Sequence, residues 1–144
     1  MLAIASDHGG YNLKEHIKAY LAAKGITCKD FGTDSEASCD YPDYAAKGCA
    51  PVVAGEVDYG VLVCGTGIGM AIAACKIDGI RAANVNNTTW AELCREHNDA
   101  NVIVLPGRFI TPQKAIELVD TFFHTDFLGG RHQRRINKIP LPQK

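Results

Sequence analysis

The sequence predicts a single α/β domain in which a five-stranded parallel sheet carries helices on both faces. Short apolar runs alternate with longer amphipathic stretches in five successive strand–helix units, which is typical of a parallel sheet with helical crossovers. A length of 144 residues suits one domain. A hydrophobic fraction of 47% and a charged fraction of 22% are ordinary for a globular protein. We therefore expect one domain over residues 1–144.

Each element is predicted from its local pattern. Five apolar runs predict the strands, at residues 2–5, 26–31, 59–63, 80–85 and 101–105. Apolar side chains at helical spacing predict helices over residues 12–24, 41–54, 67–76, 88–96 and 111–123. Gly25 is a suitable stop for the first helix. Pro42 and Pro112 suit first helical turns, and Thr111 suits an N-cap. Residues 32–40 form a polar loop.

Charge and hydropathy exclude several classes of protein. The net charge of −1 argues against nucleic acid as a partner. No apolar run approaches the roughly 20 residues of a membrane helix, and no secretory signal opens the sequence, so we predict a cytoplasmic protein with no membrane partner. Residues 131–144 hold five basic residues and no acidic one. This basic C-terminal arm is either an anion-binding segment or a solvated end, and Pro140 and Pro142 argue against a long helix in it.

The cysteines predict neither a disulfide framework nor a metal site. The chain has six, but it is long enough to fold without crosslinks. No pair forms Cys-x-x-Cys, and none stands at metal-ligand spacing from a histidine. We expect reduced thiols, with Cys28, Cys49, Cys75 and Cys94 packed in the core and Cys39 in a polar loop.

Reactive residue types follow the predicted strands. Ligands of parallel sheets bind beyond the carboxyl ends of the strands. Polar segments occur there at residues 6–10, 64–69 and 106–108, and His97-Asn98 ends the helix 88–96. We expect these segments to form one site at that edge of the sheet.

The strongest motif is Cys64-Gly65-Thr66-Gly67-Ile68-Gly69, at residues 64–69. Its glycines allow a tight turn and a close approach to a ligand, and the helix that follows offers free amides beside a positive dipole end. This predicts a site for a phosphate, a carboxylate or an enolate, the alternative being a tight turn without a ligand. Met70 stands where a dinucleotide fingerprint has its third glycine, and the Gly-Lys-Ser/Thr of a P-loop is absent.

Several side chains near these segments are suited to chemistry. A thiol at a helix N-terminus ionises more readily than a free thiol, so Cys64 is a candidate nucleophile or base, or else a packed thiol. Histidine is the natural proton carrier near neutral pH, which makes His8 and His97 candidates, whereas His16 and His124 are expected on the surface. Arg131 and Arg135 stand at i, i+4 spacing, so in a helix they would share a face suited to a phosphate, or else belong to a solvated tail.

Five segments together resemble one enzyme family. They are Ser-Asp-His-Gly-Gly at 6–10, Asp-Tyr-Pro-Asp-Tyr-Ala at 40–45, the loop 64–69, Arg-Glu-His-Asn-Asp-Ala-Asn at 95–101, and Gly-Gly-Arg-His at 129–132. In this order and spacing, over nearly the whole chain, they resemble the type B ribose-5-phosphate isomerases, within the wider family that includes the galactose-6-phosphate isomerase subunits.

The resemblance implies a Rossmann-like fold, no metal and no organic cofactor. It also implies a homodimer or a homotetramer in which each site draws on two subunits and interconverts ribose 5-phosphate and ribulose 5-phosphate. By matching position, Cys64 would be the proton-transfer base, His97 would assist ring opening, and Thr66 with the loop would hold the enediolate oxygens. The other positions implied to contact the sugar phosphate are Asp7, His8, Tyr41, Gly65, Gly67, Ile68, Gly69 and Asn98, with Arg108, Arg131 and Arg135 at its phosphate.

Alternatives remain at this point. Some family members use a carboxylate after the loop, but residues 70–74 contain no acid, so the chain resembles the cysteine-dependent branch. Residues 33–39 would set the choice of sugar, and a six-carbon phosphate such as allose 6-phosphate or galactose 6-phosphate is the nearest alternative. Others are a nucleotide- or flavin-binding module, a thiol redox protein and a catalytically silent sugar-phosphate sensor.

Overall fold

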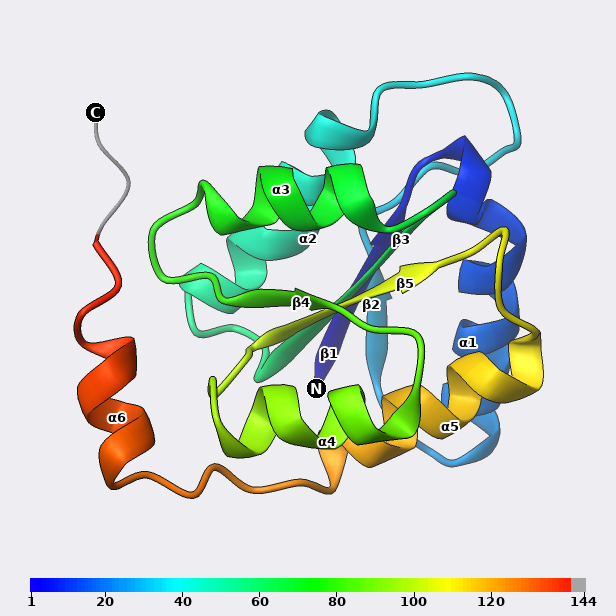
Figure 1. The fold of residues 1–144 in the computed structure, drawn as a ribbon. Helices are drawn as coiled ribbons and strands as arrows, with labels where there is room; N and C mark the ends of the chain where they lie inside the picture. The colour runs from blue at the N-terminus through cyan, green and yellow to red at the C-terminus, as the bar shows by residue number, and fades with distance from the viewer. Residues whose placement is uncertain (141–144) are drawn as a thin grey trace.

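The five strands form one all-parallel sheet, as the sequence predicts. The computed structural model describes residues 1–140 and orders the strands β2-β1-β3-β5-β4 (Figure 1). The strands are β1 (Leu2–Ser6), β2 (Cys28–Asp30), β3 (Tyr59–Cys64), β4 (Ala82–Asn84) and β5 (Val102–Pro106). Ser6 pairs with Val63, and Cys64 pairs with Pro106. The carboxyl ends of β1, β3 and β5 therefore lie side by side.

Helices cover both faces of the sheet. They are α1 (Tyr11–Ala23), α2 (Tyr41–Val53), α3 (Ile68–Cys75), α4 (Thr88–Glu96), α5 (Pro112–Phe123) and α6 (Arg131–Ile136), with a 3-10 turn η1 (His8–Gly10). Helices α2 and α3 pack on one face, and α1, α4 and α5 pack on the other. The short α6 is the folded part of the predicted C-terminal arm, whose last four residues, 141–144, lie outside the described part of the chain.

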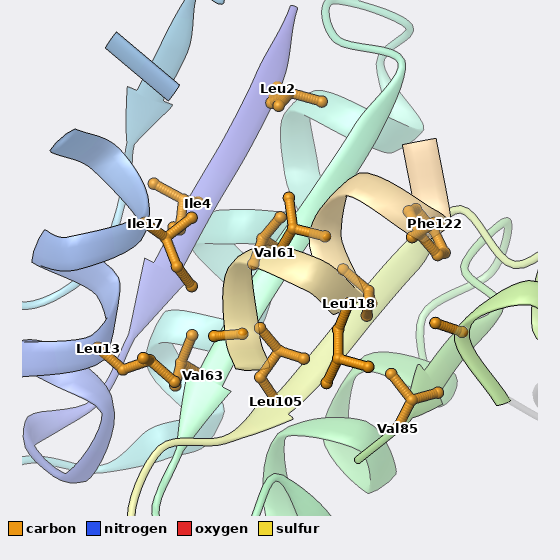
Figure 2. Close-up of a cluster of buried hydrophobic side chains, with 14 of the residues drawn as sticks. Leu2, Ile4, Leu13, Ile17, Val61, Val63, Val85, Leu105, Leu118 and Phe122 are labelled. Carbon is orange, nitrogen blue, oxygen red and sulfur yellow. The ribbon is translucent and has the colours of Figure 1, made fainter. Parts of the chain in front are cut away.

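Alternating side chains of the central strands build a core on each face. Val61 and Val63 join the cluster under α1 and α5, whereas Leu62 and Cys64 join the cluster under α2 and α3. Figure 2 shows the first cluster, to which Leu13 and Ile17 of α1, Leu118 and Phe122 of α5, and strand residues such as Val61 contribute. Burial of each large apolar side chain stabilises the fold by about 1.5–3 kcal/mol. The central strands, which carry the polar loops, are thus the most firmly packed part of the sheet.

The predicted helix ends are confirmed where a local signal marks them. The Thr111 hydroxyl accepts a hydrogen bond from the Lys114 amide at 3.1 Å and caps α5. Gly25 follows α1 with φ +71°, a conformation that glycine adopts without strain. At Asn87 the side chain caps α4 by accepting from the Trp90 amide at 2.9 Å.

Candidate active site

Cys64 ends β3 at the start of a tight turn into α3. Its side chain is buried on the α2–α3 face of the sheet. Gly67 caps α3 in the left-handed conformation, with φ +79°, and a β-carbon there would overlap the side-chain oxygen of Asn84. The Thr66 hydroxyl accepts a hydrogen bond from the Ile68 amide at 3.1 Å. Any residue other than glycine at 67 would therefore strain this turn, which brings the positive end of α3 beside the thiol.

Asp7 and His8 follow β1 and lie beside this turn. The Asp7 carboxylate is buried and caps η1, because its Oδ1 accepts from the amides of Gly9 at 2.9 Å and Gly10 at 3.2 Å. A β-carbon on Gly9 would stand only 3.1 Å from the Gly65 nitrogen. The close approach of these two glycines brings the loops after β1 and β3 together.

The loop after β2 fixes the protonation pattern of His8. The backbone amide of Cys39 donates to His8 Nδ1 at 3.2 Å, and the Cys39 sulfur lies 3.8 Å from the same nitrogen. Because a backbone N–H only donates, Nδ1 is the acceptor, and a neutral ring carries its proton on Nε2. His8 therefore offers an N–H donor from the ring nitrogen opposite the loop.

Arg108 and Tyr41 complete this group. Arg108 follows β5, its amide donates to the Gly65 carbonyl at 3.1 Å, and its guanidinium lies 3.3 Å from the place of a β-carbon on Gly65. The ring of Tyr41 lies against Gly69, where a β-carbon would be 2.8 Å from it. We call this group the cysteine site: Asp7, His8, Tyr41, Cys64, Gly65, Thr66, Gly67, Ile68, Gly69 and Arg108.

A second group lies where α4 ends and α6 begins. His97, Asn98, Arg131 and Arg135 line a cavity of about 430 Å³ together with His132 and two isoleucines. We call these five polar residues the histidine site. As predicted, Arg131 and Arg135 share one face of a helix, here α6, and both line this cavity. The cavity thus combines two guanidinium groups with two imidazole rings, a set suited to a phosphorylated ligand.

The two rings of the histidine site are stacked. The centroids of His97 and His132 are 4.3 Å apart, and the ring planes differ by 12°. Burial lowers the pKa of His132, and the nearby His97, Arg131 and Arg135 lower it further, while Glu96 acts in the opposite direction. Protonation of His132 beside His97 is therefore disfavoured.

The expectation that residues 6–10, 64–69, 106–108 and His97-Asn98 form one site at the carboxyl edge of the sheet does not hold within a single chain. Helices of a parallel sheet run back against the strands, so a helix that starts at the carboxyl edge ends at the amino edge. The contacts agree, because Arg95 near the end of α4 donates to the hydroxyl of Tyr59, the first residue of β3. Figure 1 shows α6 and the end of α4 on the side opposite the loops that follow β3 and β5. Within one chain, the histidine site is remote from Cys64.

Comparison with known proteins identifies the family. A model of the family described as Ribose/Galactose Isomerase matches residues 2–139. The chain belongs to this ribose/galactose isomerase family.

Individual members are similar over almost their whole length. The chain is 42% identical over 138 residues to Ribose-5-phosphate isomerase B of Escherichia coli, covering 96% of this chain and 93% of the relative. A solved ribose 5-phosphate isomerase of Thermotoga maritima matches at 54% identity and a TM-score of 0.95, over 96% of this chain and 95% of that one. Ribose-5-phosphate isomerase B of Mycoplasma genitalium with bound ribulose-5-phosphate matches at 43% identity and a TM-score of 0.89, over 96% of this chain and 92% of that one.

The predicted family, fold and enzyme class are confirmed. Family membership places the chain among isomerases rather than among flavin- or nucleotide-binding modules or thiol redox proteins.

Of the four cysteines predicted in the core, Cys49 and Cys94 are buried, Cys28 is half-buried against the core, and Cys75 differs. Burial raises the pKa of the Cys28, Cys49 and Cys94 thiols, to about 11, about 12 and about 11. Cys75 is exposed, although a core position is predicted. It ends α3 outside the buried stripe of Met70 and Ala74, and its thiol donates to the Ala82 carbonyl at 3.3 Å. His16 and His124 are on the surface as predicted.

Sequence reasoning missed the contribution of His132. The residue stands in the motif 129–132 that carries part of the resemblance, but no role was expected for it. The only sequence signal for His132 was its place in that motif, because its stacking partner His97 is 35 residues away in the chain.

Within residues 1–140 every helix is too short or too polar to cross a membrane. The described residues also place no three His, Cys, Asp or Glu side chains to hold one metal ion, and the predicted lack of metal and cofactor stays a prediction.

Proposed function

We propose that this family member interconverts D-ribose 5-phosphate and D-ribulose 5-phosphate through an enediolate. The observation that carries the proposal is the cysteine site, where a thiol lies at the positive end of a glycine-capped helix, beside His8 and Arg108. It is supported by the likeness to the Mycoplasma genitalium enzyme with bound ribulose-5-phosphate.

Cys64 is the base of the proposed reaction. Its thiolate takes the proton from C2 of the open-chain aldose, and the electron pair moves to the aldehyde oxygen O1. The proton then returns to C1, and the hydroxyl proton passes from O2 to O1, which leaves the ketone at C2. Thr66 and the amides of the turn hold the two oxygens while they carry negative charge, and one such donor lowers the barrier by about 3 kcal/mol.

His97 opens the sugar ring, and the arginines of α6 bind the phosphate. A closed furanose has no free aldehyde, so a group that moves a proton between the ring oxygen and O1 must act before Cys64. Two guanidinium groups on one helix face suit the phosphate oxygens, and its binding energy orients the sugar for reaction. Asn98 lines the same cavity and contacts the substrate.

A second copy of the chain supplies this half of the site. Because Cys64 and His97 lie at opposite ends of the sheet, we propose a homodimer in which each site combines one chain's cysteine site with its partner's histidine site. The surface beside Cys64 supports this, since Ile68, Trp90 and Phe109 are 56%, 56% and 73% exposed and line a cavity of about 640 Å³ with Thr66. Such an apolar patch is typical of an interface. A homotetramer made of two such dimers meets the same need.

The nearest alternative is the same chemistry on a six-carbon sugar phosphate such as allose 6-phosphate or galactose 6-phosphate. The contact between Cys39 and His8 supports this alternative. The loop before α2 touches a residue predicted to bind the substrate, so the loop can determine which size of sugar fits the site. The test is turnover of metal-stripped protein in EDTA, on ribose 5-phosphate beside allose 6-phosphate. Rapid turnover of ribose 5-phosphate supports the proposal. Turnover of allose 6-phosphate alone assigns the enzyme to six-carbon sugar phosphates, and no turnover of either sugar refutes the proposal.

A further inference from the structure

The turn that carries His97 and Asn98 out of α4 contains a strained residue. Asp99 has φ +45°, and it is the only non-glycine residue with a positive φ in the part of the chain that the structure describes. A left-handed position after a helix is usually filled by glycine, and sometimes by asparagine. The choice of aspartate is explained by the contacts of its carboxylate.

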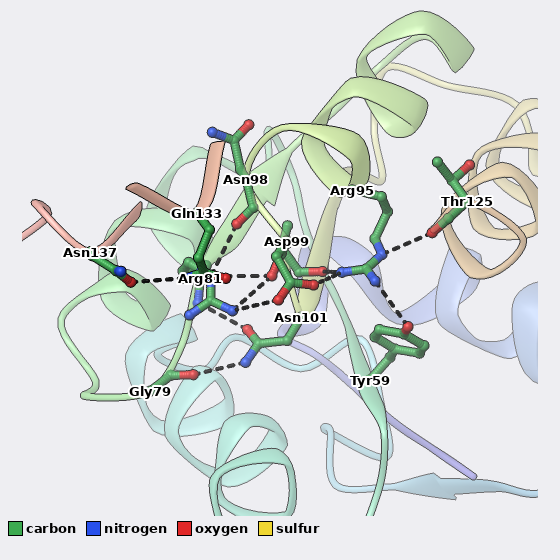
Figure 3. A network of polar contacts seen from close by, with 11 residues as sticks. Tyr59, Gly79, Arg81, Arg95, Asn98, Asp99, Asn101, Thr125, Gln133 and Asn137 are labelled. Carbon is green, nitrogen blue, oxygen red and sulfur yellow. Dashed lines mark hydrogen bonds and ion pairs between the residues drawn. The ribbon is translucent and has the colours of Figure 1, made fainter. Parts of the chain in front are cut away.

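That carboxylate bridges two arginines. Its Oδ1 accepts from NH1 of Arg95 at 2.8 Å, and its Oδ2 pairs with NH2 of Arg81 at 3.3 Å (Figure 3). The Arg95 side chain is only 6% exposed. Its guanidinium also donates to the Tyr59 hydroxyl at 3.1 Å and to the Thr125 carbonyl at 3.3 Å. Asp99 is therefore tied to a cation that is itself fixed in the core.

Arg81 holds the same turn from the other side. Its Nε donates to the carbonyls of Asn98 at 3.0 Å and of Asp99 at 3.1 Å, and its NH2 donates to the latter at 3.0 Å. The backbone of Arg81 is fixed in turn, because its amide donates to Asn101 Oδ1 at 2.9 Å. The two peptides that follow Asn98 and Asp99 are thus held by the planar guanidinium of Arg81, whose own backbone is bonded to the residue that precedes β5.

We propose that Asp99 and Arg81 are positioning residues that set the orientation of His97 and Asn98. The inference rests on the proposed function, in which His97 opens the sugar ring and Asn98 contacts the substrate. The stacking of His97 on His132 requires a fixed backbone at residues 97–99, and the two arginines supply it through the Asp99 carboxylate. Without that carboxylate, Arg95 keeps a buried charge with no anion beside it, and the turn relaxes.

Three variants separate positioning from mere folding. Asp99→Asn keeps the shape of the side chain and tolerates the left-handed backbone, but it removes the charge. Asp99→Gly removes the strain together with the carboxylate. Arg81→Lys keeps the charge but loses the fork. The control is Asp58→Asn, since Asp58 also forms an ion pair at the amino edge, with the N-terminal amine, and is exposed.

The readout compares two reactions. Deuterium exchange at C1 of ribulose 5-phosphate needs proton transfer by Cys64, but no ring opening because this ketose is acyclic. Turnover of ribose 5-phosphate needs both steps. We expect each of the three variants to lose about 10- to 100-fold in turnover while its exchange rate stays within about threefold of the parent. In addition, the ring proton signals of His97 in NMR should shift in Asp99→Asn, because the ring moves relative to His132. The control should change neither.

Two results would overturn the inference. One is an equal loss of exchange and turnover in Asp99→Asn, which would mean general damage to the fold. The other is normal turnover in Asp99→Gly, which would mean that the residue only shapes the turn. Failure of the proposed function is distinct, because the unmodified chain would then catalyse neither reaction. The NMR shift of His97 would still test the positioning: its presence would support the role of Asp99, and its absence would refute it.

Discussion

Two inactive variants of this chain should restore each other's activity. Cys64→Ala damages the cysteine site, and His97→Asn damages the histidine site at the opposite end of the same chain. In a mixed dimer, one shared site receives both lesions, and the other receives the intact Cys64 of one chain and the intact His97 of its partner. Random assortment makes half of the dimers mixed, so an equimolar mixture should recover about one quarter of the wild-type activity in a two-fold symmetric dimer.

The assay mixes the variants by co-refolding and follows ribose 5-phosphate turnover. Separately refolded samples, combined afterwards, give the baseline. The matched control pairs Cys64→Ala with Arg108→Ala, both in the cysteine site, because every site of that mixed dimer carries one lesion. A mixture of Cys64→Ala and His97→Asn that stays at the average of its two parents would refute the shared site. The catalytic half-sites would then have to meet within one chain, against the observed topology.

Four further outcomes are expected. Cys64→Ala should lower turnover by about 10²- to 10⁴-fold while ribulose 5-phosphate binding stays measurable by calorimetry, and near-normal turnover would remove the thiol from the mechanism. Arg131→Ala should raise KM by about 10-fold or more with little change in kcat, because a hydrogen bond to a charged group is worth about 1.5–3 kcal/mol; an unchanged KM would make it a bystander. Gly67→Ala should lower the free energy of unfolding, measured in urea, by more than the strain of the left-handed backbone, which is about 1–2 kcal/mol, because its methyl group also overlaps a side chain of β4. The control Gly55→Ala, with φ +74° and no neighbour within 4 Å, should show the backbone strain alone, and equal losses in the two variants would contradict the overlap. Because the pKa of His132 is lowered in the folded state, the unfolded state binds more protons, so this contribution to stability is full above the ordinary histidine pKa of about 6.5 and is lost as the pH falls below it. In urea titrations at a series of pH values, His132→Gln should reduce the dependence of the free energy of unfolding on pH, and an unchanged dependence would contradict the prediction.

The sequence was most informative where structure is decided locally. The continuous apolar run of β3 and the glycines after Cys64 predict a strand, a tight turn and a helix, and all three are present. The edge strands were predicted too long, since residues 26–31 and 80–85 contain only the short β2 and β4. Each of these strands has a single neighbour, and its length is set by the residues that pair with that neighbour rather than by the apolar run. Cys75 was misplaced because α3 is apolar on all sides, so its sequence does not distinguish a buried face from an exposed one.

The division of the site between two ends of the sheet can be derived from the sequence, and the family resemblance already implies that each site draws on two subunits. Residues 64–69 follow a strand, whereas His97 and Asn98 precede one, and in a parallel sheet these two kinds of loop belong to opposite edges. That rule separates the histidine site from Cys64 without a structure. What joins them in the proposed dimer is the shape of the surface that carries Phe109, whose exposure depends on how α3, α4 and the loop after β5 pack. No local pattern encodes that arrangement, so the sequence alone does not predict the surface on which the proposed dimer forms.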